Sequence, residues 1–580
     1  MIGIFLLSVI LLLAVSSSGF ALYTMLGQSP RNPYSAFFAG FFLLSLLAMA
    51  VSLIAPLNSI YSLLCLSPSL LGVKQLRYLF SPCSGRNHSQ LRLLGIFFAT
   101  AAACSLCAAH ATWSGLAYDT DLYHIQIVRW LNEFGTPPGL GNLHSRLANS
   151  STWPLFAALL NHSIIKDSVP WIMMPMFITA FTMYFIYDFL NSHYHFLRIY
   201  ALCMFPVCIY SLILWGFPNL YHDFPSLALV CIVGAEFLFL SFSNKHGTIN
   251  VTISILICIA LSFLIKPLSI ITVIFITPIA ILYCNQHNDI TVYTWAKILA
   301  FPLLAAALWC IRNIITSGYP FFPITAFPLQ VDWVMQASDV ASNATDVRAW
   351  ARIPGPNYLL AFERGITFWL KPWVTAFINS KHAIPTISVP LIAGSVCWLF
   401  MRKELASFKA LSLLCWPLLS LIYWFWMAPS LRFGRELFWL FFALGAACLV
   451  QYRPIPCIQA IDKFINSTTS LRYSCIVIVV FLMFVCSVVS LKVCVSLKVY
   501  FKRSLQDNSI AFFVPGTIQS LPVKLVTAQS GSAPFDVYTP IEGDRCGNAP
   551  LPCAPSVPQY IERRDAHNLG AGFRPMVQHP

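Results

Sequence analysis

The chain has 580 residues, of which 58% are hydrophobic and only 10% are charged. Soluble globular domains carry about 25% charged residues, and a soluble core would not bury this much apolar surface, so the composition excludes a soluble protein and predicts one dissolved in lipid. The net charge of +14 does not indicate a nucleic-acid partner, because Lys and Arg are scattered over short loops rather than gathered in one stripe.

Apolar runs of spanning length recur along most of the chain, and we predict an all-α fold, a polytopic bundle of about thirteen transmembrane helices. A helix needs about 20 predominantly apolar residues to cross a bilayer. The N-terminal run lacks the basic residues of a signal peptide, which favours a retained helix over a cleaved one. The bundle would occupy residues 1–500 and a polar tail residues 501–580. The predicted spans are 3–25, 35–57, 93–116, 169–190, 199–217, 223–243, 249–265, 268–284, 296–316, 384–401, 410–428, 436–451 and 473–497.

The basic residues of the loops predict an orientation, because Lys and Arg favour the cytoplasmic side of a membrane. In the thirteen-span order, five basic connections fall on one side: 58–92, 191–198, 244–248, 402–409 and 452–472. The N-terminus is then cytoplasmic, and the tail and the loops 117–168 and 317–383 are periplasmic, in a bacterial inner membrane. Lys498, Lys502 and Arg503 oppose this order, since they would lie just outside the last span.

Two of the 19 cysteines differ from the others in their surroundings. Most cysteines lie in apolar runs, where they are small buried hydrophobes. Cys546 and Cys553 lie in the polar string GDRCGNAPLPC, close enough for a small disulfide loop. If they pair, the tail is in an oxidising compartment, which agrees with a periplasmic tail.

The outer loop 117–168 contains the string YDTDLYHIQIVRWLNEFGTPPGLGNLHSR, which starts where an apolar span ends. Its first part predicts a short amphipathic helix from Asp121 to Glu133, with Asp119 or Thr120 as its cap. A carboxylate pair at the edge of a membrane cavity acts in one of two ways: one carboxylate serves as a general base, or both hold a divalent cation beside a phosphate. The alternative is that Asp119 and Asp121 only begin a helix, whose dipole favours negative charge there.

Further polar residues fall on the same outer face. Lys266 interrupts an apolar run, which costs free energy unless its ammonium reaches a polar cavity or the interface. Arginine binds phosphate through a bidentate fork, so the outer arginines predict a site for a phosphate-bearing lipid; contact with lipid headgroups or loop carbonyls is the alternative for each of them. Glu236, deep in a span, is either a structural group or part of a separate path. The predicted substrate-binding residues are His124, Arg129, His144, Arg146, Asp223, Lys266, Arg312, Arg352, Arg432 and Arg435.

The sequence resembles the GT-C superfamily of glycosyltransferases, which includes oligosaccharyltransferases, protein O-mannosyltransferases and the lipid A aminoarabinose transferase. The resemblance rests on the multi-span N-terminal half and on acidic residues in an outer loop beside an amphipathic helix. The loop follows about the third span, whereas in the superfamily it follows the first, so the chain has either two extra N-terminal spans or another ancestry. A group of large bacterial membrane proteins linked to surface polysaccharides is also similar, through the strings YDTDLYH, PGLGNLHSRL, SGYPFFP, AWARIPG and APSLRFG and the tail CGNAPLPC.

The GT-C resemblance implies an inverting glycosyltransferase whose donor is a sugar linked to polyprenyl phosphate or pyrophosphate and whose acceptor is a glycan, a lipid or a protein. It also implies that an outer-loop Asp is the base or a metal ligand. Asp119 is the best match to that residue and Asp121 the second, so both are the predicted catalytic residues. No cofactor is assigned, and a divalent cation is the one candidate. Two alternatives stay open: a polysaccharide polymerase or ligase that depends on Arg and His, and a lipid or glycan transporter without chemistry.

Overall fold

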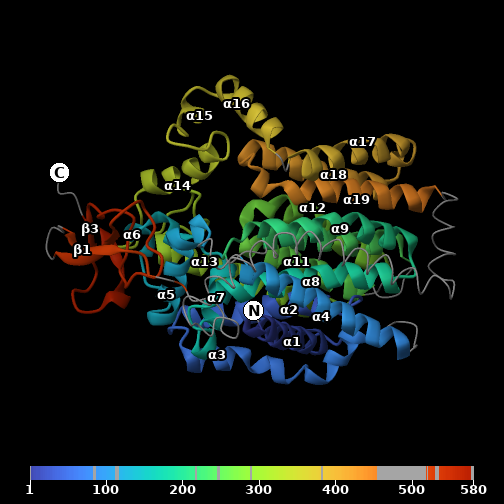
Figure 1. Ribbon diagram of the computed structural model, residues 1–580, viewed down its shortest axis with the longest axis horizontal. Coiled ribbons are helices and arrows are strands. Elements are labelled where there is room, and N and C mark those ends of the chain that lie inside the picture. The colour runs from blue at the N-terminus through green and yellow to red at the C-terminus, as the bar shows by residue number, and fades with distance from the viewer. Residues whose placement is uncertain are drawn as a thin grey trace, which may run out of the picture.

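The computed structural model describes residues 2–81, 87–110, 116–215, 219–243, 248–287, 290–380, 383–453, 518, 520–528 and 534–576. Most of them form helices that run side by side, and a smaller unit with short strands lies at one end (Figure 1). The N-terminal helices are α1 (Ile2–Met25), α2 (Ser35–Ser52), α3 (Ser59–Leu66), α4 (Asn87–His110), α5 (Ile125–Glu133), α6 (Leu140–Leu143) and α7 (Thr152–Leu160). The central ones are α8 (Pro170–Asn191), α9 (His195–Trp215), α10 (Asp223–Phe242), α11 (Thr248–Ile265), α12 (Ile270–His287) and α13 (Val292–Ser317). The last ones are α14 (Ala337–Trp350), α15 (Leu360–Glu363), α16 (Ile366–Asn379), α17 (Val389–Phe400), α18 (Phe408–Met427) and α19 (Arg435–Tyr452).

The described helices make this a multi-pass membrane protein. Ten of them are long and apolar enough to span, and the bent pair of α16 with residues Ile384–Phe400 would be an eleventh. Twelve of the thirteen predicted spans coincide with a helix, although the apolar part of α4, Leu93–Ala108, is shorter than the others. The thirteenth prediction, 473–497, lies outside the described residues.

The first two helices pack unusually closely. A Cβ atom on Gly19 would lie 1.7 Å from the carbonyl oxygen of Ala36, and one on Gly40 would lie 1.7 Å from that of Val15. Only glycine therefore permits this approach, as in the small-residue contacts of other membrane helices.

The connection after α2 runs beside α1 instead of forming a loop on one side. The amide of Leu57 donates to the carbonyl of Leu131 (2.8 Å), at the α5 end of the bundle. The chain then continues through α3 and the 3-10 segments Ser67–Leu70 and Val73–Phe80, which pack along α1. The Tyr78 ring finally lies 6.3 Å from that of Phe20, near the other end of α1. Residues 59–80 therefore cross from one end of the bundle to the other.

The packing around Ile4 bears on the predicted placement of the N-terminus opposite the C-terminal tail. Ile4 packs with Ala108 and Trp171, and Ile518 of the tail packs against the same cluster. The start of α1 therefore lies at the same end of the bundle as the tail. The predicted orientation treated 58–92 as a loop with both of its ends on one side, whereas residues 67–80 pack along α1.

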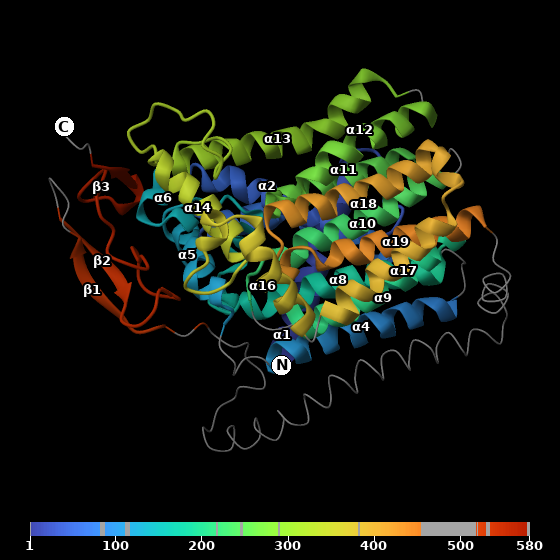
Figure 2. The same cartoon turned by 90° about the horizontal axis from the view of Figure 1, so that it is seen from above.

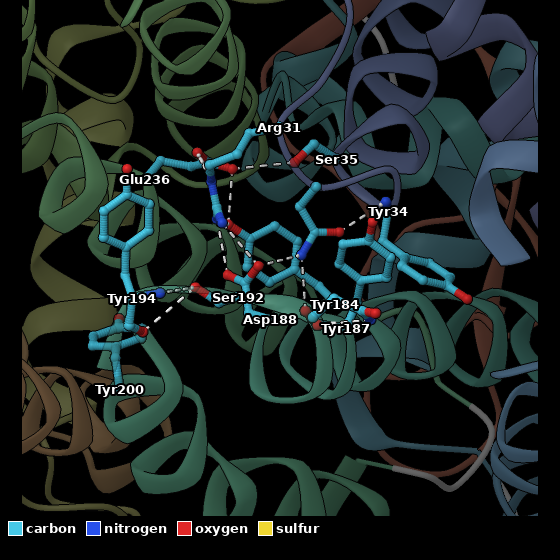
Figure 3. A network of polar contacts seen from close by, with 12 residues as sticks. Arg31, Tyr34, Ser35, Tyr184, Tyr187, Asp188, Ser192, Tyr194, Tyr200 and Glu236 are labelled. Carbon is cyan, nitrogen blue, oxygen red and sulfur yellow. Dashed lines mark hydrogen bonds and ion pairs between the residues drawn. The ribbon is translucent and has the colours of Figure 1, made fainter. Parts of the chain in front are cut away.

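The opposite end of the bundle is closed by a buried ion network around Arg31, which follows α1 (Figure 3). The Arg31 guanidinium forms a bidentate pair with Asp188 of α8 (2.8 Å for both contacts) and a third contact with Glu236 of α10 (3.0 Å). The Tyr184 hydroxyl also donates to Glu236 (2.8 Å). Glu236 is thus held structurally, in agreement with the first of the two readings of this residue, and the network joins the α1–α2 turn to α8 and α10.

The C-terminal unit contains two small antiparallel sheets that the all-α prediction did not include. In one sheet β1 (Val523–Ala528) pairs with β2 (Phe535–Pro540), and in the other β3 (Ile561–Arg563) pairs with β4 (Phe573–Pro575). The predicted disulfide between Cys546 and Cys553 is present in this unit. Helices α5 and α6 lie between the unit and the bundle (Figures 1 and 2).

Candidate functional site

Four predicted residues from distant parts of the chain form one line of ion pairs. Arg432 binds Asp119 through Nη2 (2.9 Å) and Asp223 through Nε (2.9 Å). The Lys266 ammonium binds the other oxygen of Asp223. The line therefore contains two carboxylates and two cations, and their charges sum to zero. The order along the line is Asp119, Arg432, Asp223 and Lys266.

Each of the four charges lies in, or next to, a connection between helices. Asp223 is the first residue of α10, and Lys266 follows the end of α11 just before Pro267. Arg432 lies in the 3-10 turn Leu431–Phe433 between α18 and α19. Asp119 precedes a π-helical turn, Thr120–His124, that leads into α5. The short connections between spans thus bring the charges to the same end of the bundle.

The four side chains of this line differ strongly in their exposure to solvent. The Asp223 side chain is 3% exposed and that of Lys266 18%, whereas Asp119 is 21% exposed and Arg432 35%. Asp119 and Arg432 are consequently the members that a ligand can reach first. Although burial acts to lower the pKa of Arg432, the carboxylates of Asp223 and Asp119 raise it above its ordinary value, so the guanidinium stays charged.

The three residues of the Asp-Thr-Asp string face three different segments. Asp119 binds Arg432, and the Thr120 hydroxyl accepts a hydrogen bond from the Leu220 amide (3.0 Å), which ties this string to the loop before Asp223. The Asp121 carboxylate instead faces Arg545 of the C-terminal unit (3.7 Å). Burial raises the pKa of Asp121 to about 6, and the charge of Arg545 opposes that rise.

The divergence of the two carboxylates bears on the predicted cation. A divalent metal needs several oxygen or nitrogen ligands that converge. Asp119 and Asp121 are each paired with a different arginine, and the described residues contain no cluster of three or more His, Cys, Asp or Glu side chains that would hold a metal ion. The residues present do not fit a metal held by the Asp-Thr-Asp string.

Aromatic rings surround the two cations. Lys266 Nζ lies 3.5 Å from the centroid of the Phe433 ring, and the Arg432 guanidinium lies 4.7 Å from that of Tyr221. These cation–π contacts hold the cations while leaving part of their hydrogen-bonding capacity for another group.

Two imidazoles, the buried His124 and the partly buried His222, lie next to each other close to the Asp-Thr-Asp string. The rings of His124 and His222 are 5.2 Å apart, and burial lowers the pKa of His124 to about 4. Burial likewise lowers the pKa of His144 to about 3, and the nearby charge of Arg146 acts in the same direction. The histidines are therefore neutral at pH 7, and the charge of Arg146 acts on both His124 and His144.

Besides Arg146, four predicted arginines lie outside the line of ion pairs. Arg129 donates to main-chain carbonyls of the C-terminal unit, and Arg352 donates to the carbonyls of Trp426 and Met427 at the end of α18. Arg312 is 3% exposed, and its Nε and Nη1 atoms have no hydrogen-bond partner within the described part of the chain. Arg435, also buried, lies with its guanidinium 5.7 Å from the Tyr210 ring.

Residues 1–439 match the model of a family described as a domain of unknown function, DUF8201. The chain belongs to this family. The DUF8201 region contains all four members of the line of ion pairs and ends before the C-terminal unit. No curated protein and no solved structure gives a significant match.

Sequence reasoning missed two charged residues beside the site. Glu436 in the first turn of α19 is fully buried, next to Arg435 and Trp215. Arg545, which lies beyond the DUF8201 region, reaches Asp121. Glu436 could have been found from its position beside Arg435 at the start of an apolar run. Arg545 has no distinguishing sequence feature other than its place next to Cys546.

Proposed function

We propose that the chain is a membrane glycosyltransferase of GT-C type that transfers a sugar from a polyprenyl-phosphate-linked donor to an acceptor. The observation that carries the proposal is the line Asp119, Arg432, Asp223 and Lys266, which combines a partly exposed carboxylate with two cations at the edge of the membrane bundle. A transferase of this kind needs a base for the acceptor hydroxyl and positive charge at the phosphate leaving group.

The ion pairs suggest how binding of the phosphate by the cations is linked to proton abstraction by the carboxylate. A phosphate is a strong competitor for a guanidinium, because it accepts two hydrogen bonds from the same fork. A donor phosphate that bound Arg432 and Lys266 would take over Nη2 of Arg432 and release the Asp119 carboxylate. The freed carboxylate would then accept the proton of the acceptor hydroxyl as that oxygen attacks the anomeric carbon, and the sugar–phosphate bond would break with its electrons passing to the phosphate.

The arrangement of helices also supports the GT-C resemblance. The loop with α5, α6 and α7 follows α4, and α4 packs against α8, so this loop connects two neighbouring spans. On this proposal, α1 and α2 would be the two extra N-terminal spans, and another ancestry of the chain stays the alternative.

We also propose that this end of the bundle faces the periplasm of a bacterial inner membrane. The opposite end carries the exposed residues Arg402, Lys403 and Lys409, and basic loops favour the cytoplasm. The C-terminal disulfide suits an oxidising compartment. On this orientation the start of α1 is periplasmic too.

Turnover by purified protein tests the function. We expect the protein in detergent to release polyprenyl phosphate from a polyprenyl-phosphate-linked sugar, and faster when glycan and lipid acceptors are added. Release would be measured by chromatography of the lipid products. If the labelled lipid-linked sugar instead crosses the vesicle membrane intact, with no cleavage, the result would contradict the proposal. It would then favour the alternative of a transporter. Activity that survives loss of the Asp119 carboxylate but not of Arg432 would indicate a polymerase or ligase.

A further inference from the structure

The disulfide-closed loop Cys546–Cys553 lies directly against α5. Gln126 of α5 is 1% exposed, and its Nε2 donates to the carbonyls of Gly547 and Ala549 (3.0 Å each). Arg129, one turn further along, donates through Nη1 to Asn548 (3.0 Å) and Ala549 (2.7 Å). Two adjacent side chains of one helix face thus hold three successive carbonyls of the loop.

Residues on both sides of Cys546 also contact the Asp-Thr-Asp string itself and Tyr118 before it. The Gly547 amide donates to the main-chain carbonyl of Asp121 (2.7 Å). Arg545 faces the Asp121 carboxylate, and its guanidinium lies 5.8 Å from the centroid of the Tyr118 ring. The Tyr118 hydroxyl donates to Asp544. The loop, together with Asp544 and Arg545 just before it, therefore contacts the chain before, within and after the π-helical turn that follows Asp119.

The disulfide joins this loop to the strands of the C-terminal unit. Next to Cys553, the Tyr538 amide of β2 donates to the Pro552 carbonyl (2.9 Å), and the Ala554 amide donates to the Tyr538 carbonyl (3.0 Å). Cys546, at the other end of the loop, packs in one cluster with Ala549 and Cys553, and Val523 of β1 and Tyr538 of β2 lie against this cluster. Both cysteines are 1% exposed. Closing the ring restricts the conformations of the loop, so that its carbonyls stay aligned with Gln126 and Arg129.

We propose that the loop Cys546–Cys553 is a positioning element for Asp119: it holds the π-helical turn and the start of α5, so that the Asp119 carboxylate faces Arg432. The loop belongs to the outer face but lies beyond the region 1–439 that defines the family. Asp119 binds Arg432 from the same turn whose Asp121 carbonyl the loop holds. Reduction of the disulfide would therefore loosen this turn without touching the line of ion pairs. The kinetic consequence rests on the proposed function, whereas the structural one does not.

Hydrogen–deuterium exchange of the full-length protein in detergent tests the structural part. We expect the amides of residues 118–133 to exchange roughly tenfold faster after reduction, because the hydrogen bonds that close this segment are lost. The variant C546S/C553S should show the fast exchange without reductant and no further response to it. Gln126→Glu, which places an oxygen against two carbonyls, should do the same with the disulfide intact. Arg129→Lys should retain most of the protection, and Lys524→Ala, an exposed residue of β1, should match the wild type.

Steady-state kinetics test the positioning role. Loss of the loop contacts in Gln126→Glu should lower kcat by at least tenfold, since small misplacements of a reacting group cost up to roughly 100-fold, while KM for the donor changes less than twofold. Unchanged exchange in both reduced protein and Gln126→Glu would overturn the inference. So would faster exchange with an unchanged kcat. A wild-type protein without turnover would count against the proposed function alone, because the exchange result stands by itself.

Discussion

Asp119→Asn is expected to reduce glycan transfer by roughly 10²- to 10⁴-fold, the usual contribution of a positioned general base. The substitution keeps the shape of the side chain but removes its ability to take a proton. Among the four charges, Asp119 has the more exposed of the two carboxylates, so it is the one that an acceptor hydroxyl can approach. Initial rates of transfer from a polyprenyl-phosphate-linked sugar would measure the effect at equal amounts of folded protein.

Two further variants separate this role from general changes of charge. Asp121→Asn should lose less activity than Asp119→Asn, because the Asp121 carboxylate faces Arg545 and not the two cations of the site. Asp536→Asn removes an exposed carboxylate of β2, far from the site, that accepts a hydrogen bond from the Thr527 hydroxyl, and its rate should equal that of the wild type. Full activity of Asp119→Asn beside these controls would remove Asp119 as the base.

Arg31→Met is expected to be the most destabilising single substitution of those considered. It leaves Asp188 and Glu236, 3% and 0% exposed, without their cation. Breaking a buried ion pair by removing one partner costs about 3–5 kcal/mol, so little folded protein should survive extraction. Arg31→Lys should be intermediate, since an ammonium keeps the charge but loses the bidentate fork. The fraction of monodisperse protein after heating in detergent measures the effect.

A matched control for this prediction is available at the same end of the bundle. Arg402 is exposed, so Arg402→Met should leave the midpoint of thermal aggregation unchanged. Adding Asp188→Asn and Glu236→Gln to Arg31→Met removes the orphaned charges and should recover part of the stability. Equal midpoints for Arg31→Met and Arg402→Met would show that the network does not hold the α1–α2 turn in place.

The helices and the charged residues of the site could be predicted because both can be recognised from the local sequence pattern. Apolar runs identify spans wherever lipid is the solvent. A charge at the end of an apolar run, such as Lys266 or Asp223, is expensive unless it meets a partner. The sequence therefore predicted which residues would lie on one face. The pairing of Asp119 with Arg432 depends on the packing of α4, α10 and α19, and no local pattern contains it.

Local sequence patterns did not predict two further features: the path of residues 59–80 and the partners of two arginines. The passage 59–80 has a mixture of α and 3-10 turns with many exposed residues, so it does not have the pattern of a span although it runs from one end to the other. Arginine donors satisfy phosphate and main-chain carbonyls equally well, so Arg129 and Arg352 were predicted as substrate contacts while the structure pairs them with carbonyls. Their partners lie far away in the sequence.

The proposed function requires that the site opens away from the cytoplasm. The accessibility of native lysines to a membrane-impermeant reagent tests this requirement directly. In intact cells with a permeabilised outer membrane, a membrane-impermeant amine reagent should modify Lys371 of α16 and Lys524 of the C-terminal unit, which are both exposed at the site end. Lys403 and Lys409, exposed at the opposite end, should react only after the inner membrane is opened. Mass spectrometry of the purified protein would read the modification. Reaction of Lys403 and Lys409 in intact cells, with Lys371 and Lys524 protected, would contradict the account.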